Sequence, residues 1–227
     1  MTVDRFTRLV LKPAVFLLSL APAVYLTWAL FTGHLSANPL SDVTNGTGDW
    51  TIRFVCITLA ITPLRRVTGW AGIIKFRRMV GLFAFFYGTL HFLTYLVLDR
   101  LASLDFPNGI VSWTTVVGLA KSVGVDLGKR PFITIGFTAF VLMVPLAFTS
   151  TAASIRRLGG RRWQALHRLI YVSGIAAVVH YWWLVKADIR QPLMYAVIVA
   201  VLLGFRVAWA SRRRASRPVG TASRITA

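Results

Sequence analysis

The chain has 227 residues, 56% of them hydrophobic, and long uncharged runs recur along it, which excludes an ordinary soluble domain. A net charge of +19 is also typical of nucleic-acid-binding proteins. Here, however, the basic residues lie in short stretches between apolar runs and no nucleic-acid-binding motif is present, so we expect no nucleic acid partner. Cys56 is the only cysteine, which excludes an intrachain disulfide, a cysteine-ligated iron–sulfur cluster and covalent haem attachment.

Six apolar segments are long enough to cross a membrane as helices. They lie at about 12–31, 49–64, 79–98, 132–150, 163–185 and 191–209. The sequence therefore predicts an all-α fold, a polytopic membrane helical bundle of six transmembrane helices within residues 1–211. The first segment resembles a signal peptide, but it is long for one and lacks a cleavage site, so we expect a retained helix. Pro22 and Pro145 predict kinks, because neighbouring helices can satisfy the backbone groups that proline leaves free.

The basic residues gather in regions that fall on one side of a six-span bundle. They are Arg5, Arg8 and Lys12; Arg65, Arg66, Lys75, Arg77 and Arg78; Arg156, Arg157, Arg161 and Arg162; and Arg212, Arg213, Arg214 and Arg217. The positive-inside rule then places both termini in the cytoplasm. The tail, 212–227, is basic and rich in Ser and Ala, which predicts a disordered cytoplasmic segment attracted to anionic membrane lipid.

The longest loop, 99–131, should lie on the outer side of the membrane. It is either the docking surface for an external partner or a plain connector between two helices. The sequence does not separate these two interpretations.

Three histidines lie inside apolar segments: His91, His167 and His180. An ionisable residue in hydrocarbon is costly and usually faces a cofactor, a partner or a cavity. A neutral imidazole in a helical bundle is a ready axial ligand for haem iron. For any one of the three, a hydrogen bond to a neighbouring helix is the alternative, but three together favour haem ligation. His34 lies in an outer loop and is expected to be solvated.

The depths of these histidines differ. If segments 79–98 and 163–185 both run outward, His91 and His180 lie at similar depth in the outer leaflet and can clamp one haem between them. His167 lies roughly 20 Å lower on a straight helix, an offset suited to a second haem. Helix 79–98 offers no histidine at that depth, and only Met79 is nearby. His167 can instead contact a haem propionate or a flavin, or share one haem through a bent helix.

Small residues near the outer pair agree with a closely approaching porphyrin. Gly88 precedes His91 by one turn, and Ala176 and Ala177 precede His180 by one turn. Ordinary packing between helices through small residues is the alternative explanation.

Seven stretches in this order resemble the MsrQ family, formerly called YedZ. They are TPLRR at 62–66, RRMVGL at 77–82, LHFLTY at 90–95, KRPF at 129–132, LAFTS at 146–150, WQALHR at 163–168 and HYWW at 180–183. The likeness runs from about residue 13 to 206. Members are haem-binding membrane subunits of protein-methionine-sulfoxide reductase systems, within the ferric reductase-like transmembrane superfamily that includes NADPH oxidases.

This resemblance implies a b-type haem, FMN, and a bacterial inner-membrane protein that delivers electrons to MsrP. MsrP is a periplasmic molybdopterin enzyme that reduces methionine sulfoxide in oxidised proteins. The haem histidines of the family match His91, His167 and His180. NADPH oxidases have two histidines on the third helix and this chain has only His91. The sequence therefore leaves open whether the chain binds one haem or two.

A domain that oxidises NAD(P)H is not expected, because no G-x-G-x-x-G motif is present. Electrons then come from a separate cytosolic flavin reductase, reduced FMN or quinol. We therefore expect an electron-transfer subunit of an oxidoreductase system with no complete active site of its own. The alternative is a proton-coupled membrane transporter that uses the histidines as relay groups, although no acidic residue is seen inside a predicted span. A purely structural anchor would leave the histidines unexplained.

Overall fold

The computed structural model describes residues 3–103, 112–185 and 187–215, and within these parts every element is helical. The all-α prediction is therefore confirmed for this portion of the chain. The elements are α1 (Val3–Phe6), η1 (Thr7–Leu11), α2 (Lys12–Thr32), α3 (Pro39–Thr68), η2 (Ala71–Phe76), α4 (Arg77–Leu93), η3 (Thr94–Leu101), α5 (Trp113–Lys129), α6 (Pro131–Phe148), α7 (Ala152–Leu158), α8 (Gly160–Leu166), α9 (Leu169–Leu184) and α10 (Arg190–Ala215).

Four helical segments in these parts are long and apolar enough to cross a membrane: Thr7–Thr32, Ala71–Leu101, Pro131–Phe148 and Arg190–Arg212. They correspond to four of the six predicted spans, so the count of six is not confirmed. The other two predicted spans fall on α3 and α9. α3 has Asp42 in its first turn and Arg65 and Arg66 in its last, and α9 has only 16 residues, fewer than the roughly 20 that a span needs.

The structure differs from the predicted elements at several points. α3 begins at Pro39, ten residues before the predicted 49–64, because Asn38 caps its first turn by accepting a hydrogen bond from the Ser41 N–H. The predicted loop 99–131 contains α5, which starts at a capping box formed by Ser112 and Thr115. Residues 104–111 of that loop lie outside the described residues.

The predicted helix 163–185 is interrupted at His167. α8 ends at Leu166, and the Arg168 N–H donates to the Ala165 carbonyl three residues back instead of continuing the α-helical pattern. α9 then starts at Leu169. A depth for His167 measured along one straight helix is therefore not valid. At the C-terminus, α10 continues to Ala215, into the predicted tail, and 216–227 lie outside the described residues.

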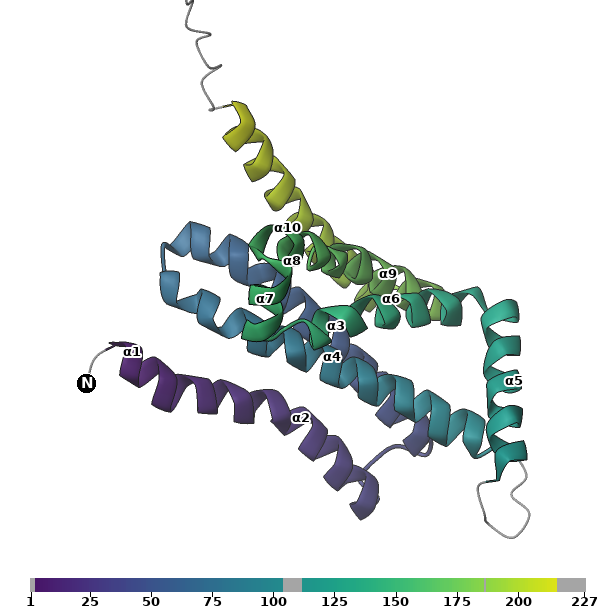
Figure 1. Ribbon diagram of the computed structural model, residues 1–227. Helices are drawn as coiled ribbons and strands as arrows, with labels where there is room; N and C mark the ends of the chain where they lie inside the picture. The colour runs from purple at the N-terminus through teal and green to yellow at the C-terminus, as the bar shows by residue number, and fades with distance from the viewer. Residues whose placement is uncertain (1–2, 104–111, 186, 216–227) are drawn as a thin grey trace, which may run out of the picture.

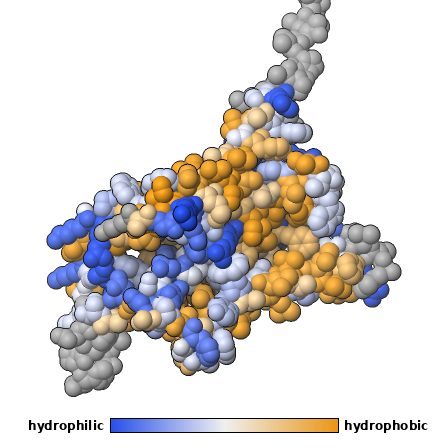
Figure 2. Space-filling view, turned by 180° about the vertical axis from the view of Figure 1, so that it is seen from behind, coloured by the Kyte–Doolittle hydropathy of each residue, from blue (hydrophilic) through white to orange (hydrophobic). Residues whose placement is uncertain are grey.

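Two antiparallel helix pairs, α3 with α4 and α6 with α9, form the centre of the bundle (Figure 1). The main core lies between them and includes the fully buried Val55, Leu59, Ala84 and Tyr87. α10 packs against α3 and α9, and α2 runs along the outside near α4. Many apolar side chains of α2, α9 and α10 remain exposed and form broad hydrophobic areas on the flank of the bundle (Figure 2). Such areas suit contact with lipid.

α2 is joined to α4 at the predicted kink. Pro22 lies inside α2, and there the Tyr87 hydroxyl donates to the Ser19 carbonyl at 2.8 Å and accepts from the Ala23 N–H at 3.0 Å. In a regular helix the Ala23 N–H would donate to the Ser19 carbonyl. Here both groups are hydrogen-bonded to the Tyr87 hydroxyl instead. A neighbouring helix satisfies the backbone groups freed near proline, as expected in a membrane bundle.

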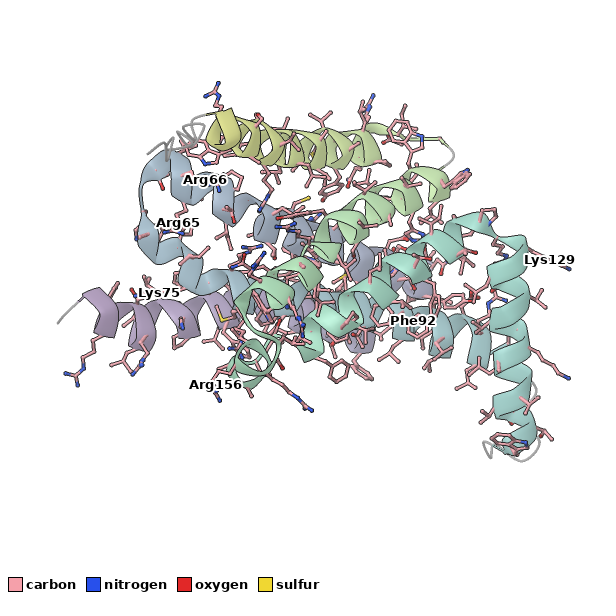
Figure 3. The ribbon with its side chains drawn as sticks, turned by 45° about the horizontal axis from the view of Figure 1, so that its top comes forward. Arg65, Arg66, Lys75, Phe92, Lys129 and Arg156 are labelled. Carbon is pink, nitrogen blue, oxygen red and sulfur yellow. The ribbon has the colours of Figure 1, made fainter. Side chains whose placement is uncertain are left out.

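Basic residues mark both ends of the bundle. Arg65, Arg66 and Lys75 gather at one end, and Lys129 lies at the other (Figure 3). At that second end α5 stands across the bundle, joining the start of α6 to the end of η3 (Figure 1). His91 and His180 both lie toward this second end of their helices, because α4 and α9 run the same way.

Candidate functional site

The structure brings His91 and His180 together. They come from α4 and α9, and their ring centroids lie 6.1 Å apart with the planes at 73°. The contact agrees with the predicted match in depth of these two residues. It depends on the two helix pairs, since each histidine sits on the second helix of its pair.

Each of these rings is oriented by a backbone carbonyl of the other helix in its pair. The Nδ1–H of His91 donates to the Thr44 carbonyl of α3 at 2.9 Å. The Nδ1–H of His180 donates to the Phe132 carbonyl of α6 at 2.7 Å. A carbonyl can only accept, so the proton of a neutral ring is placed on Nδ1 and the lone pair on Nε2. A histidine that ligates a metal through Nε2 is usually held in this way.

The spacing of the two rings fits a single iron. An imidazole nitrogen ligates a first-row metal ion at about 2.1 Å and lies about 1.1 Å from its own ring centre, so two axial rings on one iron are about 6.4 Å apart. The observed 6.1 Å is close to that value. With two neutral imidazoles as donors, the residues present fit a six-coordinate b-type haem.

The small residues singled out from the sequence are not the ones that contact the histidines. A Cβ on Gly88 would instead meet Phe140, Thr51 and Met143 at 3.6–4.0 Å. The glycines beside the rings are Gly48 of α3 and Gly136 of α6. Each follows the carbonyl that holds the ring by four residues, a relation that hydropathy alone does not reveal.

His167 lies apart from this pair, on the turn between α8 and α9. Its Nε2 is 3.1 Å from the Thr149 hydroxyl, and its ring stacks on Trp163 at 3.9 Å. The Trp163 indole N–H donates to the Thr149 carbonyl at 2.9 Å, so these three residues form one unit at the end of α6. In this arrangement the Nε2 of His167 is already engaged by a hydroxyl. Its predicted haem ligation stays a prediction.

Basic residues lie near His167. The charge of Arg77 acts on His167 and also on Arg206. Arg206 bonds the Tyr171 hydroxyl at 3.0 Å and the Leu59 carbonyl at 2.7 Å, while Arg66 lies over the Trp209 ring. These contacts gather positive charge from α3, α4 and α10, a setting that favours an anionic group.

Two acidic residues lie near the His91–His180 pair, on α3 and α5, neither of which is among the four segments that are long and apolar enough to cross a membrane. Because α3 starts at Pro39, Asp49 lies well inside a helix, where it pairs with Arg53 at 3.7 Å. Arg53 also donates to the Tyr195 hydroxyl at 3.1 Å. Hydropathy alone does not predict the first half of α3, because that half is rich in polar residues.

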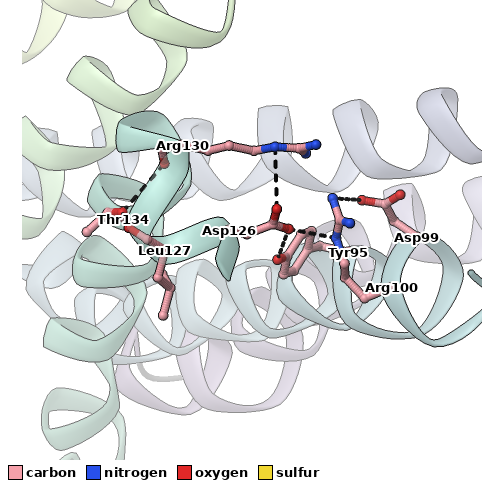
Figure 4. A network of polar contacts seen from close by, with 7 residues as sticks. All are labelled: Tyr95, Asp99, Arg100, Asp126, Leu127, Arg130 and Thr134. Carbon is pink, nitrogen blue, oxygen red and sulfur yellow. Dashed lines mark hydrogen bonds and ion pairs between the residues drawn. The ribbon is translucent and has the colours of Figure 1, made fainter. Parts of the chain in front are cut away.

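The second acidic residue, Asp126 of α5, is buried at the end of η3 (Figure 4). It accepts from the Tyr95 hydroxyl at 2.7 Å and pairs with Arg100 at 2.7 Å and Arg130 at 3.4 Å. Tyr95 follows His91 by one helical turn. This network fixes α5 across the outer end of the helix that bears His91.

Comparison with known proteins decides the family. The ferric reductase like transmembrane component family matches residues 47–179. A protein-methionine-sulfoxide reductase heme-binding subunit MsrQ of Ralstonia nicotianae is 52% identical over 88% of this chain and 85% of its own length. Proteins of the same name from Herminiimonas arsenicoxydans and Bordetella pertussis are each 47% identical, over 90% and 91% of this chain and 87% and 94% of their own lengths. No solved structure matches the chain.

The chain belongs to the MsrQ family. The resemblance stated from the seven sequence stretches is thereby confirmed. The ferric reductase match contains Gly48, His91, Gly136 and His167, and it ends one residue before His180. The match therefore covers most of both helix pairs, while Thr44 precedes it and His180 follows it.

Proposed function

We propose that this chain is a haem b electron-transfer subunit of the bacterial inner membrane. It passes electrons from the cytoplasmic side or the quinone pool to MsrP, a periplasmic molybdopterin reductase that repairs methionine sulfoxide in oxidised proteins. The observation that carries the proposal is the His91–His180 contact at 6.1 Å, with each Nδ1–H engaged by a backbone carbonyl. The names of the MsrQ relatives support haem binding by this family.

The residues of the chain would hold the cofactor and control its surroundings. His91 and His180 would hold the haem iron through their Nε2 atoms, and the Thr44 and Phe132 carbonyls fix the orientation of those rings. Bound haem supplies reversible one-electron chemistry. The aromatic and aliphatic side chains around Tyr87 exclude water below the pair, which helps to set the reduction potential.

The basic inner end would receive the electron donor. Arg77, Arg206 and His167 provide positive charge and hydrogen-bond donors for a phosphate group, so we assign the family's FMN to this end. A cytosolic flavin reductase or quinol then reduces the protein from the cytoplasmic side, where both termini lie. The outer end, with α5 and the Asp126 network, would face MsrP.

A proton-coupled transporter is the second candidate, because Asp49 provides an acidic group inside a helix. Asp49 is however paired with Arg53, and a neutralised carboxylate is a poor relay group. The relatives of the chain are also haem-binding subunits by name. We therefore favour electron transfer.

A visible spectrum of the purified protein tests the proposal. The expected result is a sharp Soret band that shifts when dithionite is added. A colourless preparation at full yield would contradict haem binding. Electron delivery is tested in proteoliposomes, where chemically reduced haem should be reoxidised rapidly only when oxidised MsrP is added. Equal, slow reoxidation with and without MsrP would point to oxygen or quinone as the acceptor.

A further inference from the structure

The same local arrangement occurs on both central helix pairs. On α3, the Thr44 carbonyl accepts from His91, and Gly48 follows four residues later. On α6, the Phe132 carbonyl accepts from His180, and Gly136 follows four residues later. Residues four apart lie on one face of a helix. Each imidazole therefore lies across a carbonyl and the glycine that follows it by one turn.

Neither glycine is required by its backbone. The positive-φ glycines in the described residues are Gly33, Gly69 and Gly159, whereas Gly48 and Gly136 lie in regular helix. Glycine inside a helix is about 1 kcal/mol less favourable than alanine. Close approach of a neighbouring group is one reason for a glycine inside a helix.

That neighbouring group is the histidine in both cases. A Cβ on Gly136 would lie 2.6 Å from Nδ1 and 2.8 Å from Cε1 of His180, closer than real side chains pack. A Cβ on Gly48 would lie 3.1 Å from the same two atoms of His91. Both contacts involve the nitrogen that donates to the carbonyl. A methyl group on Gly136 would push the ring of His180 off its acceptor, and one on Gly48 would displace the ring of His91 by a few tenths of an ångström.

The arrangement is repeated with nearly equal spacing. Gly48 precedes His91 by 43 residues, and Gly136 precedes His180 by 44. In each half the glycine lies on the first helix of an antiparallel pair and the histidine on the second. The two halves meet where the rings are 6.1 Å apart.

We propose that Gly48 and Gly136 are positioning residues for the haem ligands. By lacking a side chain, each lets an imidazole lie flat enough on its neighbouring helix for Nδ1–H to reach the carbonyl. The hydrogen bond keeps the proton on Nδ1 and directs the Nε2 lone pair toward the iron. This inference rests on the proposed haem function.

The test compares glycine-to-alanine variants of the full-length protein. Gly136→Ala is expected to lower haem affinity by about 10- to 100-fold, the usual effect of losing a group that orients a metal ligand. It should also convert the ferric electron paramagnetic resonance signal from low spin to high spin. Gly48→Ala, where the ring must move less, should shift the low-spin signal and the midpoint potential with a smaller loss of haem. Gly81→Ala on α4 is the matched control, because its Cβ meets ordinary contacts with Thr58 from 3.5 Å.

A readout without haem separates positioning from folding. In apoprotein with ¹⁵N-labelled histidine, the His180 shifts should report the Nδ1–H tautomer in the wild type and a mixture of tautomers in Gly136→Ala. Gly48→Ala should do the same for His91, and Gly81→Ala should change neither. If Gly136→Ala does not fold, the Gly48→Ala spectra decide.

The outcomes distinguish this inference from the proposed function. Haem affinity, spin state and tautomers equal to those of Gly81→Ala would overturn the positioning role while leaving haem binding intact. Unchanged haem in His91→Ala and His180→Ala would overturn the proposed function itself.

Discussion

The outer histidine pair and the inner His167 use the same side chain in opposite ways. His91 and His180 each engage Nδ1 with a backbone carbonyl of a neighbouring helix, so Nε2 keeps its lone pair. His167 places Nε2 against the Thr149 hydroxyl and its ring against Trp163. Three histidines that look equivalent in an apolar sequence are therefore separated by which nitrogen is already bonded. This difference supports the proposed iron ligation by His91 and His180, whereas the Nε2 of His167 is already bonded to a hydroxyl.

Removing either outer histidine should have the largest effect. His91→Ala or His180→Ala takes away one of two protein ligands, so bound haem should fall by roughly 10-fold or more. The pyridine haemochrome assay and the Soret absorbance measure this loss. His34→Ala is the control, since His34 is exposed and bonds Thr32, two residues earlier in the sequence. If all three variants keep wild-type haem, the outer pair does not hold the iron.

Breaking the Asp126 network should destabilise the outer region next to His91. Asp126→Asn removes the buried negative charge that pairs with Arg100 and Arg130. Breaking a buried ion pair lowers the free energy of unfolding by about 3 kcal/mol. Thermal unfolding in detergent should occur at lower temperature, with faster proteolysis at α5. Asp188→Asn is the control, because its pair with Arg190 is exposed and contributes close to nothing. Equal unfolding temperatures for both variants would show that the network does not hold α5.

Removing the Tyr87 hydroxyl should have a smaller effect. Tyr87→Phe keeps the buried ring but leaves the Ser19 carbonyl and the Ala23 N–H without this partner, at a cost of about 1–2 kcal/mol. Haem should be retained, because the ring at position 87, one turn before His91, still packs against Phe54. Tyr25→Phe, at an exposed position of α2, should match the wild type in the same unfolding assay. A loss of haem in Tyr87→Phe would mean that α2 helps to place His91.

The sequence predicts the apolar helices of the bundle better than its polar segments and the contacts of its histidines. The all-α class and four long spans follow from composition, because lipid exposure requires uninterrupted apolar helices. The adjacency of His91 and His180 agrees with depth arguments alone. The early start of α3 was missed because its first half is polar, and the break at His167 because i→i+3 bonding leaves no mark on hydropathy. The roles of Gly48 and Gly136 depend on which helices pair, and no local pattern specifies that pairing.

The smallest effect on haem is expected at His167, and it decides between one haem and two. If the outer pair holds the only haem, His167→Ala should leave the haem-to-protein ratio at about one and the low-spin signal unchanged. The Trp163–Thr149 bond persists in this variant, so the end of α6 should keep its structure. FMN content should fall, because the inner basic group loses a donor beside Arg77. Haem quantification and flavin fluorescence on the same sample make both measurements. A wild-type ratio of about two that drops to about one in His167→Ala would instead place a second haem at the inner end, and the hydroxyl contact of His167 would then have to yield to iron.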